Sequence, residues 1–257
     1  MSSHFKHPDI FRDRHIGPDE SQIKSMLQTI NYDSLENLID TTIPASIRFN
    51  QPIPESFNKS ADSEFQALKN LEAMGSKNKI FKSYIGAGYS NTITPPVIQR
   101  NILENPGWYT QYTPYQSEIS QGRLEALLNF QTMVMDLTGM GFANASLLDE
   151  ATAASEAMTM AYNLTNHSNV LLISSRCHTQ TINVVKTRAE PLGIDIQVID
   201  HNEISTADNF FGIILQYPCT EGGVEDYSKI SEIAHNNNAL VIVCADILAL
   251  TILTPPG

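Results

Sequence analysis

"FGIILQYPCTEGGVEDYSKISEIAHNNNALVIVCAD" runs from residue 211 to residue 246 and contains the pattern that decides the fold. Residues 211–216 and 239–246 are short apolar runs that are rich in β-branched side chains. Between them, residues 226–237 have the apolar spacing of a helix. Continuous apolar runs are typical of strands buried on both faces of a parallel sheet, and a helix is the usual connection between such strands. This stretch therefore predicts a strand, a helix and a second strand of a parallel sheet.

The sequence before this stretch repeats the same alternation. "NVLLIS" (169–174) and "DIQVID" (195–200) read as strands, and a helical pattern covers residues 179–188 between them. Four strands alternating with helices predict an α/β fold whose parallel sheet is covered by helices. In such sheets, ligands bind at the carboxyl ends of the strands, so the residues that follow each strand are the first candidates for a site.

The first part of the chain reads as mostly helical. A brief helical pattern at 97–104 is ended by Pro106 and Gly107, and we expect two parts, a helical segment with a connector (1–104) and an α/β domain (105–257). Ser117 is expected to cap a long helix that is apolar on much of its surface and therefore buried. An Ala-rich helix follows a turn within 144–163. The helices expected before these cover residues 16–30, 33–40, 61–75 and 97–104.

Composition excludes several functions. The chain has 257 residues, 42% of them hydrophobic, and its net charge of −12 argues against a nucleic-acid partner, since binding phosphates needs clustered Lys and Arg. The longest apolar tract, 239–253, is interrupted by Asp246 and predicts no membrane span. No secretory signal is visible, so a cytoplasmic location is expected. Three widely spaced cysteines predict buried thiols rather than a disulfide framework or a metal site: Cys177, Cys219 and Cys244.

Three polar residues fall at the ends of predicted elements. His178 follows the strand at 169–174, Asp246 closes the strand at 239–246, and Thr152 begins the Ala-rich helix. An imidazole that can stack on a ring, a carboxylate that can face a pyridinium nitrogen and an anion-binding helix start would together suit pyridoxal phosphate. The alternatives are a structural histidine and an aspartate that caps a turn.

Two features of the sequence oppose a complete cofactor site. Asp149 and Glu150 lie where the phosphate of the cofactor would bind. A pyridoxal enzyme also needs a lysine to attach the cofactor, which is expected after the strand that bears Asp246. Residues 247–257 contain no lysine, and the last lysine of the chain is Lys229. Read alone, the chain therefore cannot complete pyridoxal chemistry.

A Gly-Ala-Gly sequence at 86–88 is a second, weaker candidate for phosphate binding. It lacks the third glycine of a dinucleotide-binding motif. A tight backbone turn is the simpler interpretation.

Several long strings resemble the glycine cleavage system P-protein family. They are "RHIGP" (14–18), "YIGAGYSNTITPPVI" (84–98), "NPGWYTQYTPYQSEISQGRLEALLNFQT" (105–132), "NASLLDEATAASEAM" (144–158), "TRAEPLGI" (187–194), "QYPCTEGGVEDY" (216–227) and "LALTILTPPG" (248–257). The resemblance implies a fold-type-I, PLP-dependent transferase-like large domain that is incomplete at its C-terminal end. It also implies glycine decarboxylation on pyridoxal 5'-phosphate and transfer of the aminomethyl group to the lipoyl arm of H-protein.

The same resemblance implies that P-proteins have two similar halves, fused or separate, and that the C-terminal half carries the cofactor lysine. This chain would be part of the first half and inactive alone. The alternative is a non-catalytic subunit that stabilises a lysine-bearing partner. The family's pocket lies near the contact between the halves, which makes residues 108–123 a predicted pocket wall. The candidates are Tyr112, Tyr115, Glu118 and Arg123, although the aromatic side chains could equally anchor the loop on the helix behind it.

Overall fold

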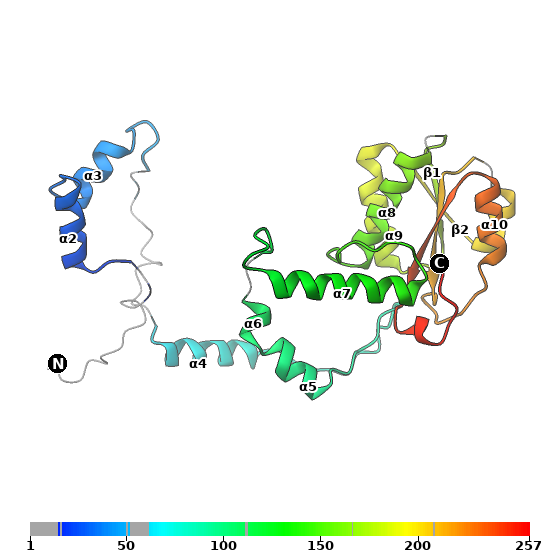
Figure 1. Ribbon diagram of the computed structural model, residues 1–257, viewed down its shortest axis with the longest axis horizontal. Helices are drawn as coiled ribbons and strands as arrows, with labels where there is room; N and C mark the ends of the chain where they lie inside the picture. The colour runs from blue at the N-terminus through cyan, green and yellow to red at the C-terminus, as the bar shows by residue number, and fades with distance from the viewer. Residues whose placement is uncertain are drawn as a thin grey trace. The chain divides into compact units, whose positions relative to one another are not determined.

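The computed structural model describes residues 15, 17–49, 51, 62–110, 113–165, 167–207 and 209–257 (Figure 1). Its contacts divide the chain into two compact units, Met1–Lys82 and Ser83–Gly257. The contacts therefore group residues 83–104 with the α/β part, whereas the sequence placed the boundary after residue 104. The domain boundary after residue 104 therefore stays a prediction.

The first unit contains three described helices, α2 (Glu20–Thr29), α3 (Leu35–Thr42) and α4 (Glu64–Gly75). The first expected helix was predicted to include Pro18, but α2 begins two residues later. The Asp19 carboxylate accepts the Gln22 N–H at 2.8 Å, and the Gln22 side chain accepts the Asp19 N–H at 2.9 Å. This reciprocal capping box fixes the start of α2.

The second unit begins with a segment that makes few buried contacts. Its elements are α5 (Pro96–Ile98), the π-helix η3 (Gln99–Leu103), α6 (Pro106–Tyr109) and α7 (Gln121–Thr138). The α7 helix begins at Gln121 rather than at Ser117, because residues 113–120 form successive turns. None of its residues is buried, which corrects the prediction of a buried helix. The carboxyl end of α7 meets the end of the chain, where the Gly257 N–H donates to the Thr138 carbonyl oxygen at 2.9 Å.

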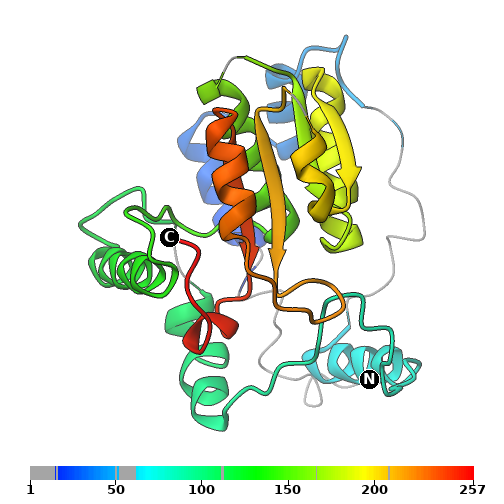
Figure 2. The same ribbon diagram turned by 90° about the vertical axis from the view of Figure 1, so that its right-hand side faces the viewer.

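The remainder of the second unit is the predicted α/β fold. Its strands are β1 (Val170–Ser174), β2 (Asp195–Ile199), β3 (Gly212–Tyr217) and β4 (Leu240–Ala245), and each lies within one residue of its predicted bounds. All pairs are parallel and the order is β2-β1-β3-β4. Figure 2 shows these strands side by side. The helices are α8 (Glu150–Thr165), α9 (Thr179–Ala189) and α10 (Ser228–Asn236), with the 3-10 helices η4 (Glu190–Leu192), η5 (His201–Thr206) and η6 (Ala249–Thr251).

Alternation along the strands gives the sheet two apolar faces. Ile173 and Ile214 pack with Met158 of α8, whereas Leu172 and Ile213 belong to a second cluster that includes α10. Successive side chains of a strand point to opposite faces, so both faces of a central strand must be apolar when helices cover both. Figure 1 shows α8 and α9 on one face and α10 on the other. Within the described residues, no helix is long and apolar enough to cross a membrane.

Candidate functional site

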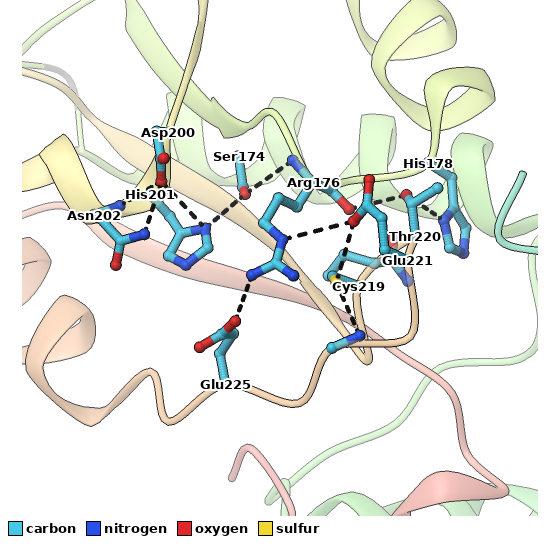
Figure 3. A network of polar contacts seen from close by, with 12 residues as sticks. Ser174, Arg176, His178, Asp200, His201, Asn202, Cys219, Thr220, Glu221 and Glu225 are labelled. Carbon is cyan, nitrogen blue, oxygen red and sulfur yellow. Dashed lines mark hydrogen bonds and ion pairs between the residues drawn. The ribbon is translucent and has the colours of Figure 1, made fainter.

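The carboxyl ends of the four parallel strands lie at the same end of the sheet. The predicted polar residues lie at this end. The chain runs from β1 through residues 175–177 to His178, which occupies the N-cap position of α9. The loop that follows β3 brings Thr220 to the same place, and α8 contributes Glu150. Figure 3 shows His178, Thr220 and the neighbouring polar network. We call His178, Thr220 and Glu150 the histidine cluster.

Hydrogen bonds fix the orientation of the buried His178 ring. The side chain is 6% exposed, and its Nδ1 lies 3.0 Å from the Thr220 hydroxyl. That hydroxyl donates to the carbonyl oxygen of Arg176 at 2.9 Å, and a hydroxyl has a single proton to donate. The Nδ1 atom therefore carries a proton and donates to Thr220. The other ring nitrogen, Nε2, faces Oε1 of Glu150 at 4.0 Å.

The turn at residues 86–89 lies directly against the same ring. The backbone φ angles of Ala87 and Gly88 are +56° and +91°, and the Tyr89 N–H donates to the Gly86 carbonyl oxygen. Positive φ at both central positions is the type I′ turn pattern, which glycine favours. A Cβ on Gly88 would overlap the His178 imidazole, and the Tyr89 ring lies 5.0 Å from it in a tilted arrangement. The Gly-Ala-Gly sequence is thus a turn, as the simpler interpretation predicted, and it covers one side of His178.

Glu150 gives the histidine cluster a negative charge. Its Oε1 is buried and has no hydrogen-bond partner among the described residues, and the same is true of the Thr181 hydroxyl oxygen. Burial, and secondarily Glu150, raises the pKa of Tyr89. The same two causes raise the pKa of the Cys177 thiol to about 12. An anionic ligand at this position would therefore face an uncompensated carboxylate.

The start of α8 is already occupied by a carboxylate. Asp149 Oδ1 accepts the N–H of Thr152 at 2.7 Å, in the arrangement of a helix N-cap. Hydrogen bonds from the Thr152 side chain and backbone hold the pKa of Asp149 below its usual value. The predicted anion-binding position at Thr152 thus has its backbone donor taken by an ionised side chain.

The Asp246 carboxylate caps the turn that follows it in the sequence. This carboxylate accepts the N–H of Leu248 at 3.0 Å, ahead of η6, and the Asp246 N–H donates to the Tyr217 carbonyl oxygen at 2.9 Å. The side chain is exposed. This is the capping arrangement that the sequence left open as an alternative.

The sequence did not predict one group of ion pairs at the carboxyl ends of the strands. Arg176 pairs with Glu225, and its Nε lies 3.6 Å from Oε2 of Glu221 (Figure 3). The hydrogen bond to Glu225 is the main cause that raises the pKa of Arg176. Arg176 thereby ties the end of β1 to the loop after β3, which carries Thr220. Its place two residues beyond a predicted strand was the only available signal.

A buried polar contact beside this network also escaped prediction. Ser174, at the end of β1, places its hydroxyl 3.1 Å from Nδ1 of His201, which is almost fully buried. The hydroxyl and the imidazole satisfy each other away from solvent, which indicates a structural role. Within the part of the chain that the structure describes, no three metal-binding side chains gather into a metal site.

The predicted pocket wall lies apart from the histidine cluster. Tyr115 is 82% exposed, Glu118 is also exposed, and Arg123 Nη2 donates to the Trp108 carbonyl oxygen at 3.3 Å. Tyr112 lies outside the described residues. These residues are at the amino end of α7, and an 18-residue helix spans about 27 Å. The opposite end of α7 is the one that meets Gly257. The structure therefore does not bring the two predicted groups together.

The residues at the carboxyl ends of the strands do not fit pyridoxal phosphate. Asp149 occupies the helix start that would hold the phosphate, the 86–89 turn covers His178, and Asp246 caps a turn. The predicted cofactor roles of Thr152, His178 and Asp246 stay predictions, and no chemical step on the cofactor is assigned to them.

Comparisons with known proteins define the class first. A crystal structure of an inhibitor-bound glycine decarboxylase (P-protein) of the glycine cleavage system superimposes with a TM-score of 0.80 and 31% identity. It covers 93% of this chain and 55% of the solved chain. Together with the helix-covered parallel sheet, this match confirms the predicted α/β fold of the PLP-dependent transferase type.

The family follows from sequence matches. The family model of the glycine cleavage system P-protein matches residues 13–257. A glycine dehydrogenase (decarboxylating) of Synechocystis sp. is 57% identical over 97% of this chain, and the mitochondrial protein of that name from Dictyostelium discoideum is 51% identical over 98%. The chain belongs to the glycine cleavage system P-protein family. It spans about a quarter of the length of these two relatives, 25% and 26% respectively.

Proposed function

We propose that this chain is a part of a glycine decarboxylase that acts only together with the rest of a P-protein. The observation that carries the proposal is 57% identity over 97% of the chain to a protein named glycine dehydrogenase (decarboxylating). The complete enzyme would decarboxylate glycine and pass the aminomethyl group to the lipoyl arm of H-protein. When bound, pyridoxal phosphate supplies the electron sink for loss of carbon dioxide. A cytoplasmic location is part of the proposal.

In this proposal the cofactor lysine comes from a C-terminal half, either fused or separate. At the carboxyl ends of its own strands, Asp149 already accepts the Thr152 N–H, and Oε1 of Glu150 is buried without a hydrogen-bond partner among the described residues. Carboxylates therefore lie where a phosphate would need donors.

The contribution of this chain is to shape and close the pocket of the partner half. Tyr115 and Glu118 support this role, because both lie in the turns before α7 and both side chains are exposed. Arg123 orients that loop through its contact with Trp108, and Tyr112 joins the wall by sequence position.

A second candidate function is a non-catalytic subunit that stabilises a lysine-bearing partner without lining its pocket. The many exposed apolar side chains of residues 83–148 favour it, since surfaces of this kind mark protein contacts. The two functions differ in what loss of the wall residues does. A pocket wall changes turnover, whereas a stabilising subunit changes only assembly.

The test is to co-express this chain with the lysine-bearing remainder of the Synechocystis relative and to measure carbon dioxide release from glycine with H-protein present. We expect activity from the pair and none from either polypeptide alone. Tyr115→Phe and Glu118→Gln should each lower kcat/KM by about tenfold or more, because each removes a group that orients the substrate. The matched controls are Tyr84→Phe and Glu125→Gln, which alter exposed residues outside the proposed wall.

Two results would overturn parts of this proposal. Carbon dioxide release by the 257-residue chain alone would show that it is a complete enzyme. Unchanged turnover of both wall variants, in a complex that assembles normally, would exclude the pocket wall and leave the stabilising subunit.

A further inference from the structure

Three buried side-chain oxygens have no hydrogen-bond partner among the described residues, and all three lie on one side of the sheet. They are Oε1 of Glu150, Oε1 of Gln216 and the hydroxyl oxygen of Thr181. Gln216 follows Ile214 by two residues in β3, so its side chain is on the face that α8 covers. Glu150 begins α8 and Thr181 lies in the first turn of α9. Because buried polar atoms are rarely left unpaired, this grouping indicates a ligand that supplies the partners.

The chain itself encloses these oxygens. Gln216 is 3% exposed and Thr181 is fully buried. The Gln216 Nε2 donates to the Cys244 carbonyl oxygen at 3.0 Å, so only the acceptor end of this amide is unpaired. The Glu150 side chain is 37% exposed and gives a small solute a route from solvent. A ligand that reaches these atoms without opening the α/β part must therefore consist of very few atoms.

The arrangement of protons at His178 adds a further acceptor. Its Nδ1 carries the proton that it donates to Thr220, so Nε2 of the neutral ring presents a lone pair (Figure 3). This lone pair faces Oε1 of Glu150 across 4.0 Å, which is too long for a direct hydrogen bond. One donor atom between them could make hydrogen bonds of about 2.9 Å to both. The two acceptors thus define a position for a single atom with several N–H or O–H groups.

Charge distinguishes between the donors that could occupy this position. Among the described residues, His178 is the only ion-pair partner of Glu150, and a neutral ring does not compensate the carboxylate. Burial of a carboxylate oxygen without a compensating charge costs free energy, which a cation would recover. An anion would add to the negative charge, and Asp149 already takes the Thr152 N–H at the start of α8. The position therefore favours a cation that donates hydrogen bonds.

We propose that Glu150, His178 and Gln216 form a binding site for the ammonium ion. Its four N–H groups can donate to Glu150 and His178 and still serve the oxygens of Gln216 and Thr181. Potassium has a similar size but no proton to donate to the imidazole lone pair. The 86–89 turn rests on the His178 ring and leaves little room for an alkylated amine. This site does not depend on the proposed function, since neither glycine nor a partner half contributes to it.

Urea unfolding at constant ionic strength tests for the ion. The 257-residue chain is unfolded near pH 7 in ammonium chloride, in potassium chloride and in tetramethylammonium chloride. A ligand that binds only the folded chain raises the urea midpoint in proportion to its occupancy. We expect a saturable rise in ammonium and none at equal concentrations of the other two cations. Equal midpoints in the three salts would overturn the proposal.

A matched pair of variants tests the position of the ion. Glu150→Gln keeps the shape of the side chain and removes its charge, so half-saturation should need about tenfold more ammonium or more. Glu156→Gln is the control, because Glu156 lies on the same helix and pairs with Arg188 at the surface. This control should bind ammonium like the unaltered chain. Equal affinity of both variants would place the ion elsewhere and overturn the site.

Nitrogen NMR of the His178 ring in the unaltered chain gives a test that needs no variant. Ammonium should move the Nε2 signal with the same half-saturation as the urea midpoint, while the ring keeps only its Nδ1 proton. A ring that carries both protons in the absence of ammonium would overturn the site, because His178 would then supply the positive charge itself. An Nε2 signal that ammonium does not move would also overturn it and leave a water molecule as the bridging donor. None of these readouts uses glycine turnover, so they decide the site whether or not the proposed function holds.

Discussion

Residues 150–257 and residues 83–149 belong to one compact unit, yet they bury their apolar side chains very differently. Every buried apolar residue of the described chain lies at or after Ala151, whereas Ser120 is the only buried residue described between 83 and 149. Both stretches are rich in Leu, Ile, Met and aromatic residues. The difference is that the later stretch pairs strands and stacks helices on them, while no residue of α7 is buried. Apolar composition therefore produces a core only where a second layer is available to cover it.

The largest expected difference between the two regions is the effect of truncating an apolar side chain. Ile214 lies in β3 and is fully buried, so Ile214→Ala should lower the free energy of unfolding by about 2–5 kcal/mol. Leu128 on α7 is 63% exposed, and Leu128→Ala should change it by no more than about 0.5 kcal/mol. Urea unfolding of both variants measures the comparison. A cost at Leu128 similar to that at Ile214 would mean that α7 is covered in solution.

A smaller effect is expected where the two regions touch. Gly88→Ala places a methyl group on the His178 ring, so the 86–89 turn should leave the ring. Gly86→Ala is the matched control, since Gly86 also has a positive φ but open space around its Cβ position, and it should cost only about 1 kcal/mol in strain. The NMR signal of the His178 Cε1 proton reports the contact, because the Tyr89 ring lies 5.0 Å away.

The outcome of this comparison is specific to the turn. In Gly88→Ala the His178 signal should move to its position in a Tyr89→Leu variant, while in Gly86→Ala it should stay near that of the unaltered chain. Identical signals in all four proteins would show that the turn does not rest on His178 in solution.

The smallest expected effect is a pH dependence at the junction of the two regions. The pKa of Asp149 is lowered in the folded chain by its hydrogen bonds to Thr152. A lowered pKa means that the stabilisation is fully present above the usual value of 3.8 and is lost as the pH falls through the folded value. Asp149→Asn keeps a hydrogen-bond acceptor but cannot be protonated in this range. We therefore compare the urea midpoints between pH 5 and 3, a window of about two pH units around the carboxylate pKa. In this window the midpoint of the unaltered chain should fall more steeply than that of the variant. Parallel slopes would exclude a contribution from this cap.

The sequence predicted the α/β part well because its signals are local. The runs at 169–174 and 239–246 have the length and composition of buried strands, and the observed β1 and β4 lie within a residue of them. The predicted start of α7 was wrong because several residues before Gln121 can cap a helix. The turns from Thr113 to Ser120 also depend on backbone geometry that composition does not specify. The prediction that α7 is buried was wrong because an apolar helical pattern cannot show whether a covering layer is present.

The candidate site was predicted in part. His178 lies at the N-cap of α9, just after β1, as its position after a predicted strand indicated, and Asp149 accepts the Thr152 N–H at the start of α8. The predicted roles of these residues in a site stay predictions. The partners of His178 could not be predicted, because Thr220 and Gly88 are distant in sequence and reach the ring through a loop and a turn. The use of Asp246 as a cap was foreseen only as an alternative, since the same residue type serves both roles.

The three cysteines give this chain a natural chemical reporter of opening. Cys177, Cys219 and Cys244 are all free and buried, and all lie in the α/β part. Burial raises the pKa of Cys177 to about 12, so at neutral pH hardly any reactive thiolate forms there while the sheet is closed. A thiol reagent would therefore modify Cys177 only in molecules whose α/β part has opened, and a partner that favours the folded α/β part would slow that modification.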